Sequence, residues 1–270
     1  MWSADTNIIQ LNLSGKNKDW SVLWLKTHTE INHDSHITVA FRSTDALDIE
    51  NLSKENITLS VNDQIHYAGI ILDANLTSYT AQSGFEYQLF IESPLALMKA
   101  ERKSQTWTNL TPLDVLKKIL IQYPSLNAGI QWKITRNFSS WPSIVQYNES
   151  DWHFFQRMVS RLGLSYLIEP HKNFRMIITD RANQLNNQAI ETIHYNGAQG
   201  MAASDDAFQY HITKKQLPSS VRVRSDSTDY PSSFYAEEAN LPANLASSGC
   251  LIIDNMHFQN QENAKLYAEQ

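Results

Sequence analysis

The sequence predicts a mainly β fold with an α/β insert, and three observations support this prediction. Over the first ninety or so residues, apolar side chains alternate with polar ones in short runs, which is typical of half-buried strands. After Ser93 and Pro94 the apolar spacing becomes that of amphipathic helices. From about residue 182 onward, short alternating runs return. We therefore expect three successive segments, 1–93, 94–181 and 182–270.

The first segment contains at least four predicted strands joined by short polar turns. They cover residues 37–41, 57–61, 64–72 and 85–91. The second and third of these flank Asn62 and Asp63, which are typical turn residues, so we expect them to pair as a hairpin. Several short antiparallel strands with tight connections are typical of a β-sandwich or a small barrel.

Two amphipathic helices are predicted in the second segment. The first covers 112–123, with Thr111 as its N-cap and Pro124 after its last residue. The second begins after the N-cap Ser150 and ends at Gly163, a residue type that favours the left-handed conformation at helix ends. Its apolar side chains, which we expect in the core, are Trp152, Phe155, Met158, Val159 and Leu162.

Short strands are predicted around the second helix and throughout the last segment. They cover residues 130–134, 164–168, 174–178, 190–195, 207–213 and 221–224. The final run, 261–270, looks helical but carries no stop signal, so we expect the last domain to be incomplete at its C-terminus.

Composition and charge disfavour several classes of protein. Hydrophobic residues make up 42% of the 270 and aromatic residues 10%, which is too apolar for a disordered chain. The 22 basic and 28 acidic residues give a net charge of -6, which argues against binding nucleic acid. The single Cys250 excludes an internal disulfide, and we interpret it as structural. Without a signal sequence or a long apolar run, we expect no membrane-spanning segment and assembly in the cytoplasm.

A search for metal and catalytic patterns gives no convincing site. The densest group of potential metal ligands is His28, His33, Asp34 and His36, but it lacks the spacing of a metal motif and we interpret it as a solvated strand edge. There is no Gly-x-Ser-x-Gly nucleophile elbow and no glycine-rich phosphate loop. The acidic doublets at 205–206 and 237–238 are interpreted as solvated loop charges.

One segment resembles a known signature. Residues 144–158, continuing to Tyr166, resemble the Gln-Tyr-x-Glu-Ser-Asp helix, with its trailing glycine and strand, of VgrG spike proteins in type VI secretion systems and of related phage tail hub proteins. The matching residues are Gln146, Tyr147, Glu149, Ser150, Asp151, Phe155, Gly163 and Tyr166. Gly69, within 67–71, resembles the glycine of a β-turn-β segment of the same family.

This resemblance implies a fold and a set of partners. Two small β-barrel tube domains of the phage baseplate hub type, 1–93 and 182–270, would flank an α/β connecting domain at 94–181. The chain would form a homotrimer that docks on a hexameric tube protein, contacts other baseplate components and carries a secreted effector. It would have no catalytic residues, cofactor or metal, and after assembly in the cytoplasm it would be injected through a contractile apparatus.

Two alternatives stay open. A prophage tail baseplate hub has the same fold and role as a type VI spike base. A carbohydrate-binding or hydrolytic β-protein would explain the many aromatic residues and would use Glu149 and Asp151 as a carboxylate pair. However, Ser150 and Asp151 are better explained as a helix N-cap and a first-turn charge, and the aromatic stripe that includes Phe154 as core rather than a ligand pocket.

Overall fold

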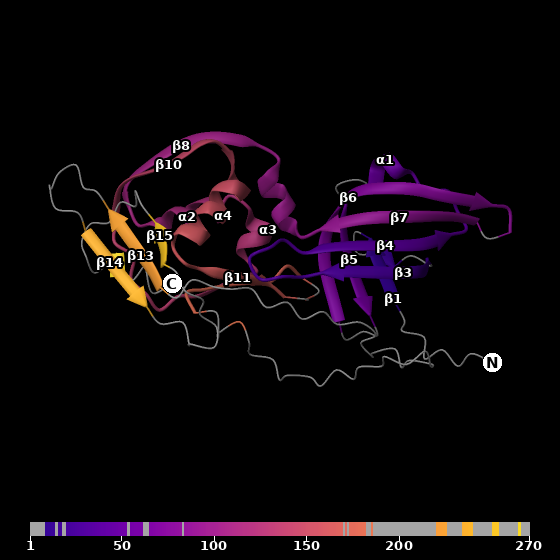
Figure 1. The fold of residues 1–270 in the computed structure, drawn as a ribbon. Coiled ribbons are helices and arrows are strands. Elements are labelled where there is room, and N and C mark those ends of the chain that lie inside the picture. The colour runs from indigo at the N-terminus through magenta and orange to yellow at the C-terminus, as the bar shows by residue number, and fades with distance from the viewer. Residues whose placement is uncertain are drawn as a thin grey trace, which may run out of the picture. The chain divides into compact units, whose positions relative to one another are not determined.

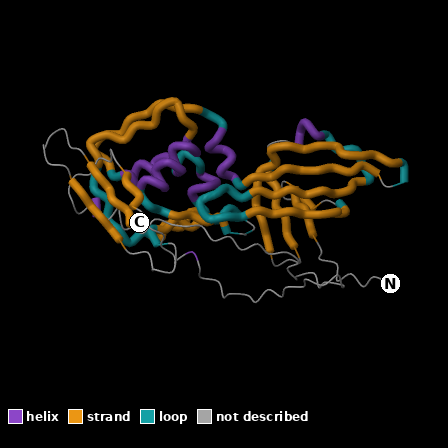
Figure 2. Tube along the Cα trace, viewed as in Figure 1, coloured by secondary structure: helices purple, strands orange, loops and turns teal. Residues whose placement is uncertain are grey.

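The computed structural model divides the chain into two compact units, residues 1–190 and 191–270, and each is described by itself. The structure describes residues 9–13, 16–17, 20–52, 55–61, 65–82, 84–169, 171, 173–181, 185, 220–225, 234–239, 250–253 and 264–265. Among the described residues strands outnumber helices, and the two longest helices lie between residues 112 and 161 (Figure 2). Within the described residues, no helix is long and apolar enough to cross a membrane.

Seven strands form one antiparallel sheet in the N-terminal part of the first unit (Figure 1). In sequence order they are β1 (Ile9–Leu13), β2 (Lys16–Asn17), β3 (Ser21–His28), β4 (His36–Ser43), β5 (Asn56–Val61), β6 (Ile65–Thr80) and β7 (Gly84–Glu92). Their order across the sheet is β2-β1-β5-β6-β7-β4-β3, and the short helix α1 (Ile49–Leu52) connects β4 to β5. All four predicted strands are confirmed, as is the hairpin of β5 with β6.

The connection between β2 and β3 requires this sheet to curl. These two strands lie at opposite edges, yet only residues 18–20 separate them in the chain. The four Cα steps from Asn17 to Ser21 reach at most about 15 Å. A flat sheet of seven strands would be about 29 Å wide at the usual strand spacing. The two edges must therefore approach each other, which makes the sheet a half-barrel.

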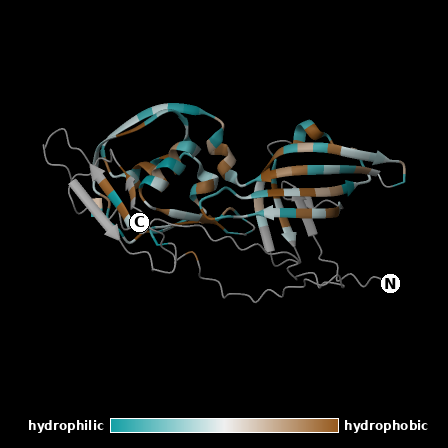
Figure 3. Ribbon diagram, in the orientation of Figure 1, coloured by the Kyte–Doolittle hydropathy of each residue, from teal (hydrophilic) through white to brown (hydrophobic). Residues whose placement is uncertain are grey.

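Apolar side chains of this half-barrel form one buried core, and apolar and polar residues alternate along its strands (Figure 3). The buried set comprises Ile37, Val39, Phe41, Leu52, Ile57, Leu59, Ile71, Ala74, Tyr87, Leu89 and Ile91. Stacked rings run along it: the centroids of Trp20 and Phe41 are 4.3 Å apart, and those of Phe41 and Tyr87 5.6 Å. Burial of this face stabilises the curl, since each fully buried large apolar side chain contributes about 1.5–3 kcal/mol.

The α/β element follows the half-barrel. Its parts are the 3-10 helix η1 (Pro94–Lys99), β8 (Arg102–Leu110), α2 (Pro112–Leu120), α3 (Pro124–Asn127), β9 (Ile130–Lys133), β10 (Trp141–Ser150), α4 (Asp151–Arg161), β11 (Ser165–Ile168) and β12 (Met176–Thr179). Strands β8 and β10 form a two-stranded antiparallel ribbon, and β11-β12-β9 form a small mixed sheet. One apolar core lies among the helices, the ribbon and this sheet.

Local sequence signals account for the helices of this element. Thr111 caps α2 by accepting a hydrogen bond from the Asp114 amide at 3.1 Å, as predicted. The predicted end at residue 123 is wrong by three residues: α2 ends at Leu120, and Pro124 occupies the first position of the next short helix rather than only stopping the first. Strands β8 and β10 were not predicted, because apolar residues do not mark their inward faces. The inward positions of β8 include Lys103 and Gln105, and on β10 Gln146 is buried while Tyr147 is exposed.

The second unit contains a three-stranded sheet. Its strands are β13 (Ser220–Ser225), β14 (Phe234–Ala239) and β15 (Cys250–Ile253), in the order β14-β13-β15. The strand predicted at 221–224 is confirmed, whereas those at 190–195 and 207–213 lie outside the described residues. The acidic doublet 237–238 belongs to β14, opposite Arg222 and Val221, so the loop predicted there is wrong. The other doublet, Asp205 and Asp206, lies outside the described residues.

Candidate functional site

The motif segment forms a bulged strand end rather than the start of a helix. Residues 146–150 belong to β10, whose pairing with β8 shifts register between Gln146 and Glu149. Within the bulge, Asn148 adopts a left-handed φ of 46°. Residues 146–150 therefore precede the helix, which begins at Asp151 after the extended N-cap Ser150, as predicted.

Gln146 holds this bulge together. Its side chain is fully buried, and its Nε2 donates to the Glu149 carbonyl at 3.0 Å and to Asp151 Oδ1 at 2.9 Å. One amide thereby binds the backbone of the bulge and the first carboxylate of α4. Tyr147, the next motif residue, is 80% exposed and takes no part in this arrangement.

Asp151 is the centre of a buried polar cluster. Its side chain is only 1% exposed, and its Oδ2 accepts hydrogen bonds from Lys103 Nζ at 2.9 Å and from the Tyr123 hydroxyl at 2.7 Å. With Gln146, three elements therefore converge on one carboxylate: the ribbon strand β8, the loop before α3, and β10. Sequence reasoning placed Asp151 in the first turn correctly, but its partners at positions 103 and 123 gave no local signal.

Electrostatics keep this carboxylate charged. Burial by itself would raise the pKa of Asp151, but the hydrogen bonds from Gln146, Lys103 and Tyr123 outweigh it and lower the pKa below its usual value. Burial and the adjacent Asp151 raise the pKa of Tyr123, which therefore stays protonated and donates. Asp151 is thus a fixed structural anion at neutral pH, without the raised pKa that a general acid needs.

Ser150 and Glu149 fasten the beginning of α4. Ser150 Oγ accepts a hydrogen bond from the His153 amide at 3.2 Å, which confirms the predicted N-cap. Glu149 pairs with Arg157, whose Nη2 also donates to the Val145 carbonyl at 2.9 Å. Arg157 thereby joins the second turn of the helix to the free edge of β10.

The remaining motif residues around α4 are structural. Phe155 and Tyr166 are buried with ring centroids 5.4 Å apart, which confirms that the aromatic stripe is core and not a ligand pocket. Gly163 has a φ of 57°, as predicted for the residue after a helix end. The Arg136 guanidinium donates to the carbonyls of Leu162 and Gly163 at 2.8 and 3.2 Å, which satisfies the C-terminal end of α4.

Gly69 belongs to a different part of the molecule. It lies inside the continuous strand β6, so the β-turn-β interpretation of residues 67–71 is wrong. A Cβ at this position would overlap Ile91 Cγ2 and lie 2.7 Å from the Glu92 carbonyl oxygen. Glycine is required here because β6 and β7 approach closely.

A second polar cluster, which the sequence did not reveal, joins the half-barrel to the α/β element. Asp34 is buried, and its carboxylate accepts hydrogen bonds from Ser93 Oγ and the Ser35 amide and pairs with Lys99 at 2.8 Å. Beside it, the Asn32 amide donates to the Tyr166 carbonyl, and Asn32 Oδ1 accepts from the Tyr166 amide, both at 2.9 Å. The solvated strand edge predicted for the segment containing Asp34 is therefore wrong at this residue, although the three histidines there are exposed.

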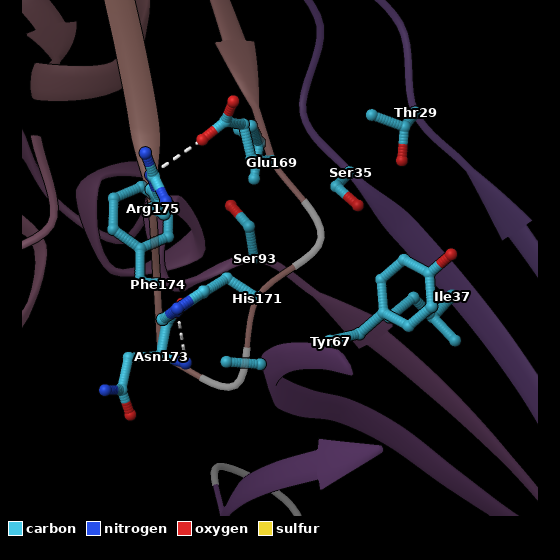
Figure 4. A pocket seen from close by; sticks show the side chains of 12 residues that line it. Thr29, Ser35, Ile37, Tyr67, Ser93, Glu169, His171, Asn173, Phe174 and Arg175 are labelled. Carbon is cyan, nitrogen blue, oxygen red and sulfur yellow. Dashed lines mark hydrogen bonds and ion pairs between the residues drawn. The ribbon is translucent and has the colours of Figure 1, made fainter. Parts of the chain in front are cut away.

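A small polar hollow lies beside this junction (Figure 4). Its lining includes Tyr67 and Ser35 from the half-barrel side and Glu169, His171 and Arg175 from the α/β side. Glu169 pairs with Arg175 at 2.7 Å. His171 Nδ1 lies within hydrogen-bond distance of the backbone N–H and the carbonyl oxygen of Asn173, at 3.2 and 3.1 Å. The polar groups here bind one another, as is usual at a structural junction.

These clusters offer no arrangement for catalysis. Glu149 is paired with Arg157 and Asp151 with Lys103, so neither carboxylate is available for the hydrolytic role considered above. Among the residues that the structure describes, no three side chains of His, Cys, Asp or Glu are grouped to hold a metal ion. What the motif provides is a set of polar contacts that join the ribbon, α4 and the half-barrel.

Solved structures with a similar fold come from phage tails and injection machines. A tail protein from Neisseria meningitidis matches with a TM-score of 0.62 at 14% identity, covering 97% of this chain and 74% of that one. The 43 kDa tail protein of a Shewanella oneidensis prophage matches with a TM-score of 0.61 at 14% identity, covering 98% and 77%. A type VI secretion component from E. coli matches with a TM-score of 0.59 at 19% identity, and the match covers 64% of this chain and 49% of the E. coli chain. At these identities the likeness shows a shared fold.

The described residues thus form a mainly β fold with a curled half-barrel sheet, similar to the fold of these proteins. A family model for the phage tail baseplate hub (GPD) matches residues 28–269, and the chain belongs to this family. Members are structural components of the baseplate, so the chain is not an enzyme. None of the curated proteins compared matches the chain in sequence.

Proposed function

We propose that this chain is the hub at the base of a puncturing spike, and that three copies adapt a threefold needle to a hexameric tube. The observation that carries the proposal is the hub-family match over residues 28–269, together with the curled half-barrel that begins the chain. A second barrel in 182–270 would give each chain two similar units, with the α/β domain 94–181 between them. Three such chains would then present six units to the six subunits of a tube.

We infer a prophage or phage tail as the first candidate setting. The two tail proteins cover 97% and 98% of this chain and about three quarters of their own length. A type VI secretion spike of the VgrG kind is the second candidate, supported by the E. coli component, of which this chain spans about half (49%). Genes for tail sheath, terminase and capsid nearby would favour the prophage, and genes for a type VI membrane complex would favour the secretion system.

The partners follow from this role. The trimer would contact the hexameric tube protein and other baseplate components, and in the secretion setting it would carry an effector. Assembly would take place in the cytoplasm, followed by injection through the contractile apparatus. The buried polar contacts of Asp151 and of Asp34 support such a role, since a hub under load needs elements that do not unfold locally.

The test is cryo-electron microscopy of the cognate tube protein together with the full-length spike. We expect a ring of three hub chains at the tube end, with the half-barrel and residues 182–270 both facing the tube. A ring with another number of chains, or density that places these regions away from the tube, would contradict the proposal. Light scattering of the isolated 270-residue chain, alone and with tube protein, gives the stoichiometry in solution.

A further inference from the structure

Charge is strongly segregated along this acidic chain. Residues 94–181, the α/β element, carry twelve Lys and Arg but only six Asp and Glu. Residues 1–93 carry the opposite balance, five basic and twelve acidic. The basic element and the acidic half-barrel belong to the same compact unit, so each copy of the unit presents both signs. A surface divided in this way favours association between copies.

Most of the acidic side chains of the α/β element form ion pairs within that element. Glu149, Asp151, Glu169 and Asp180 each lie within 4 Å of a Lys or Arg nitrogen of the same element. Lys117, Lys118 and Lys133 have no carboxylate partner among the described residues. Part of the surplus positive charge therefore lies on α2 and β9.

The end of α2 combines this charge with an apolar centre. Lys117 and Lys118 are exposed in its last turn. Ile121 follows them by four and three residues, so it lies on the same side of the helix, and it is 64% exposed. The Lys117 ammonium lies 5.6 Å from the centroid of the half-buried Trp132 ring. We call these four residues the α2 patch. An apolar centre with a charged rim is the usual build of a protein interface.

The half-barrel carries the complementary surface. Asp45, Asp48 and Glu50 are all exposed in the short connection that contains α1, and none pairs with a Lys or Arg among the residues the structure describes. We propose that the α2 patch of one copy of this chain binds this acidic connection of a second copy. The inference rests on the proposed hub trimer and names the contact between its neighbouring chains.

A contact of this kind can close into a ring. Two different surfaces of the same chain meet, so the interface is heterologous, and a heterologous interface that closes after three steps gives a trimer. Ile121 and Trp132 would supply the buried centre, and the lysines would fix the register against the carboxylates. The acidic connection also offers Ile49, which is half-buried, as an apolar contact.

The test measures self-association of the 270-residue chain by sedimentation from about 0.01 M to about 1 M salt, over which the screening length falls from about 30 Å to about 3 Å. We expect oligomers at low salt that dissociate at high salt. The double variant Lys117→Glu and Lys118→Glu should weaken the association constant by about tenfold or more, and so should Asp45→Lys with Asp48→Lys. All four changes in one chain should restore association, because the charges are exchanged and not removed.

The matched control is Lys26→Glu with Arg181→Glu, two exposed positions outside the patch that change the net charge equally. We expect this control to associate like the unchanged chain. Three results would overturn the inference. They are no self-association at low salt, an association constant that neither charge reversal changes, or a quadruple variant that associates no more strongly than the double variants. Loss of tube binding with self-association unchanged would assign the α2 patch to the tube protein and also overturn it. If the charge-reversed variants still form the trimeric hub ring, this contact is contradicted but the proposed function is not.

Discussion

At the residue scale, the beginning of α4 depends on one carboxylate that meets donors from three separate elements. Lys103, Tyr123 and Gln146 all bind Asp151, and each of them belongs to a different strand or loop. Removing a buried acceptor leaves its donors without partners, which costs more than the bond itself contributes. Asp151 therefore stabilises the tertiary arrangement and not only its own helix.

The first prediction is that Asp151→Asn lowers the free energy of unfolding by about 1–3 kcal/mol at pH 7. Because the pKa of Asp151 is lowered in the folded protein, the stability that its charge contributes is present above the unfolded value of about 4 and is lost as the pH falls through the lower folded value. Urea unfolding at several pH values should show the two proteins converging in acid. Asp114→Asn, at an exposed first-turn position of α2, is the control and should change little. A constant difference across this pH range would contradict the prediction.

The second prediction concerns the aromatic core. Phe155 is fully buried against Trp152 and Tyr166, so Phe155→Ala should lower stability by about 3–5 kcal/mol through the cavity it leaves. Tyr147→Ala, a change at an 80% exposed position, should stay within about 0.5 kcal/mol. Chemical denaturation of both variants decides the matter: equal stability of the two would mean that the α4 stripe is not core.

The third prediction is the loss of a helix cap. Ser150→Ala removes the acceptor of the His153 amide and should cost about 1 kcal/mol, without affecting the oligomeric state. Ser150→Asp keeps an acceptor at the cap and should recover most of the loss. Thermal unfolding of the three proteins tests this, and an alanine variant as stable as the parent would exclude a role for the cap.

At the element scale, sequence patterns predicted the helix caps and strands that depend on residues close together in the chain. The caps Thr111, Ser150 and Gly163 and the alternation of β4 and β7 follow from residues a few positions apart, and all are confirmed. Strand β3 was hidden by a bulge between Val22 and Trp24, which breaks the period of two. The ribbon β8–β10 was not predicted because Gln146 is buried while its neighbours Val145 and Tyr147 are exposed, which reverses the usual pattern of a half-buried strand.

The fourth prediction belongs to the pairing of β6 with β7. Gly69→Ala would place a methyl group against Ile91 and the Glu92 carbonyl, so one strand must move and stability should fall by about 1–3 kcal/mol. Asn75→Ala, at an exposed position of the same strand, should be nearly neutral. Denaturant midpoints measure the difference, and a stable Gly69→Ala protein would mean that the strands are less close than the geometry requires.

At the scale of the whole first unit, the half-barrel and the α/β element are tied by contacts between residues far apart in sequence. Asn32 meets Tyr166 across 134 positions, and Asp34 meets Ser93 across 59. Neither pair has a local signature, which is why the segment that contains Asp34 was interpreted as solvated. The same contacts explain why two elements with separate apolar cores form one compact unit.

The last prediction follows from this junction. Asp34→Ala removes the acceptor of the Ser93 hydroxyl and one of the two carboxylates that pair with Lys99, while Glu92 still pairs with Lys99. We therefore expect the free energy of unfolding to fall by about 1–3 kcal/mol. The sharper consequence is a loss of coupling. In the unchanged protein the amides of β4 and of α4 should exchange with the same opening free energy, because both cores open together. In the variant they should diverge, with one core opening before the other, as native-state hydrogen exchange would record. Amides that already diverge in the unchanged protein would show that the two elements fold independently and that the joint does not transmit stability between them.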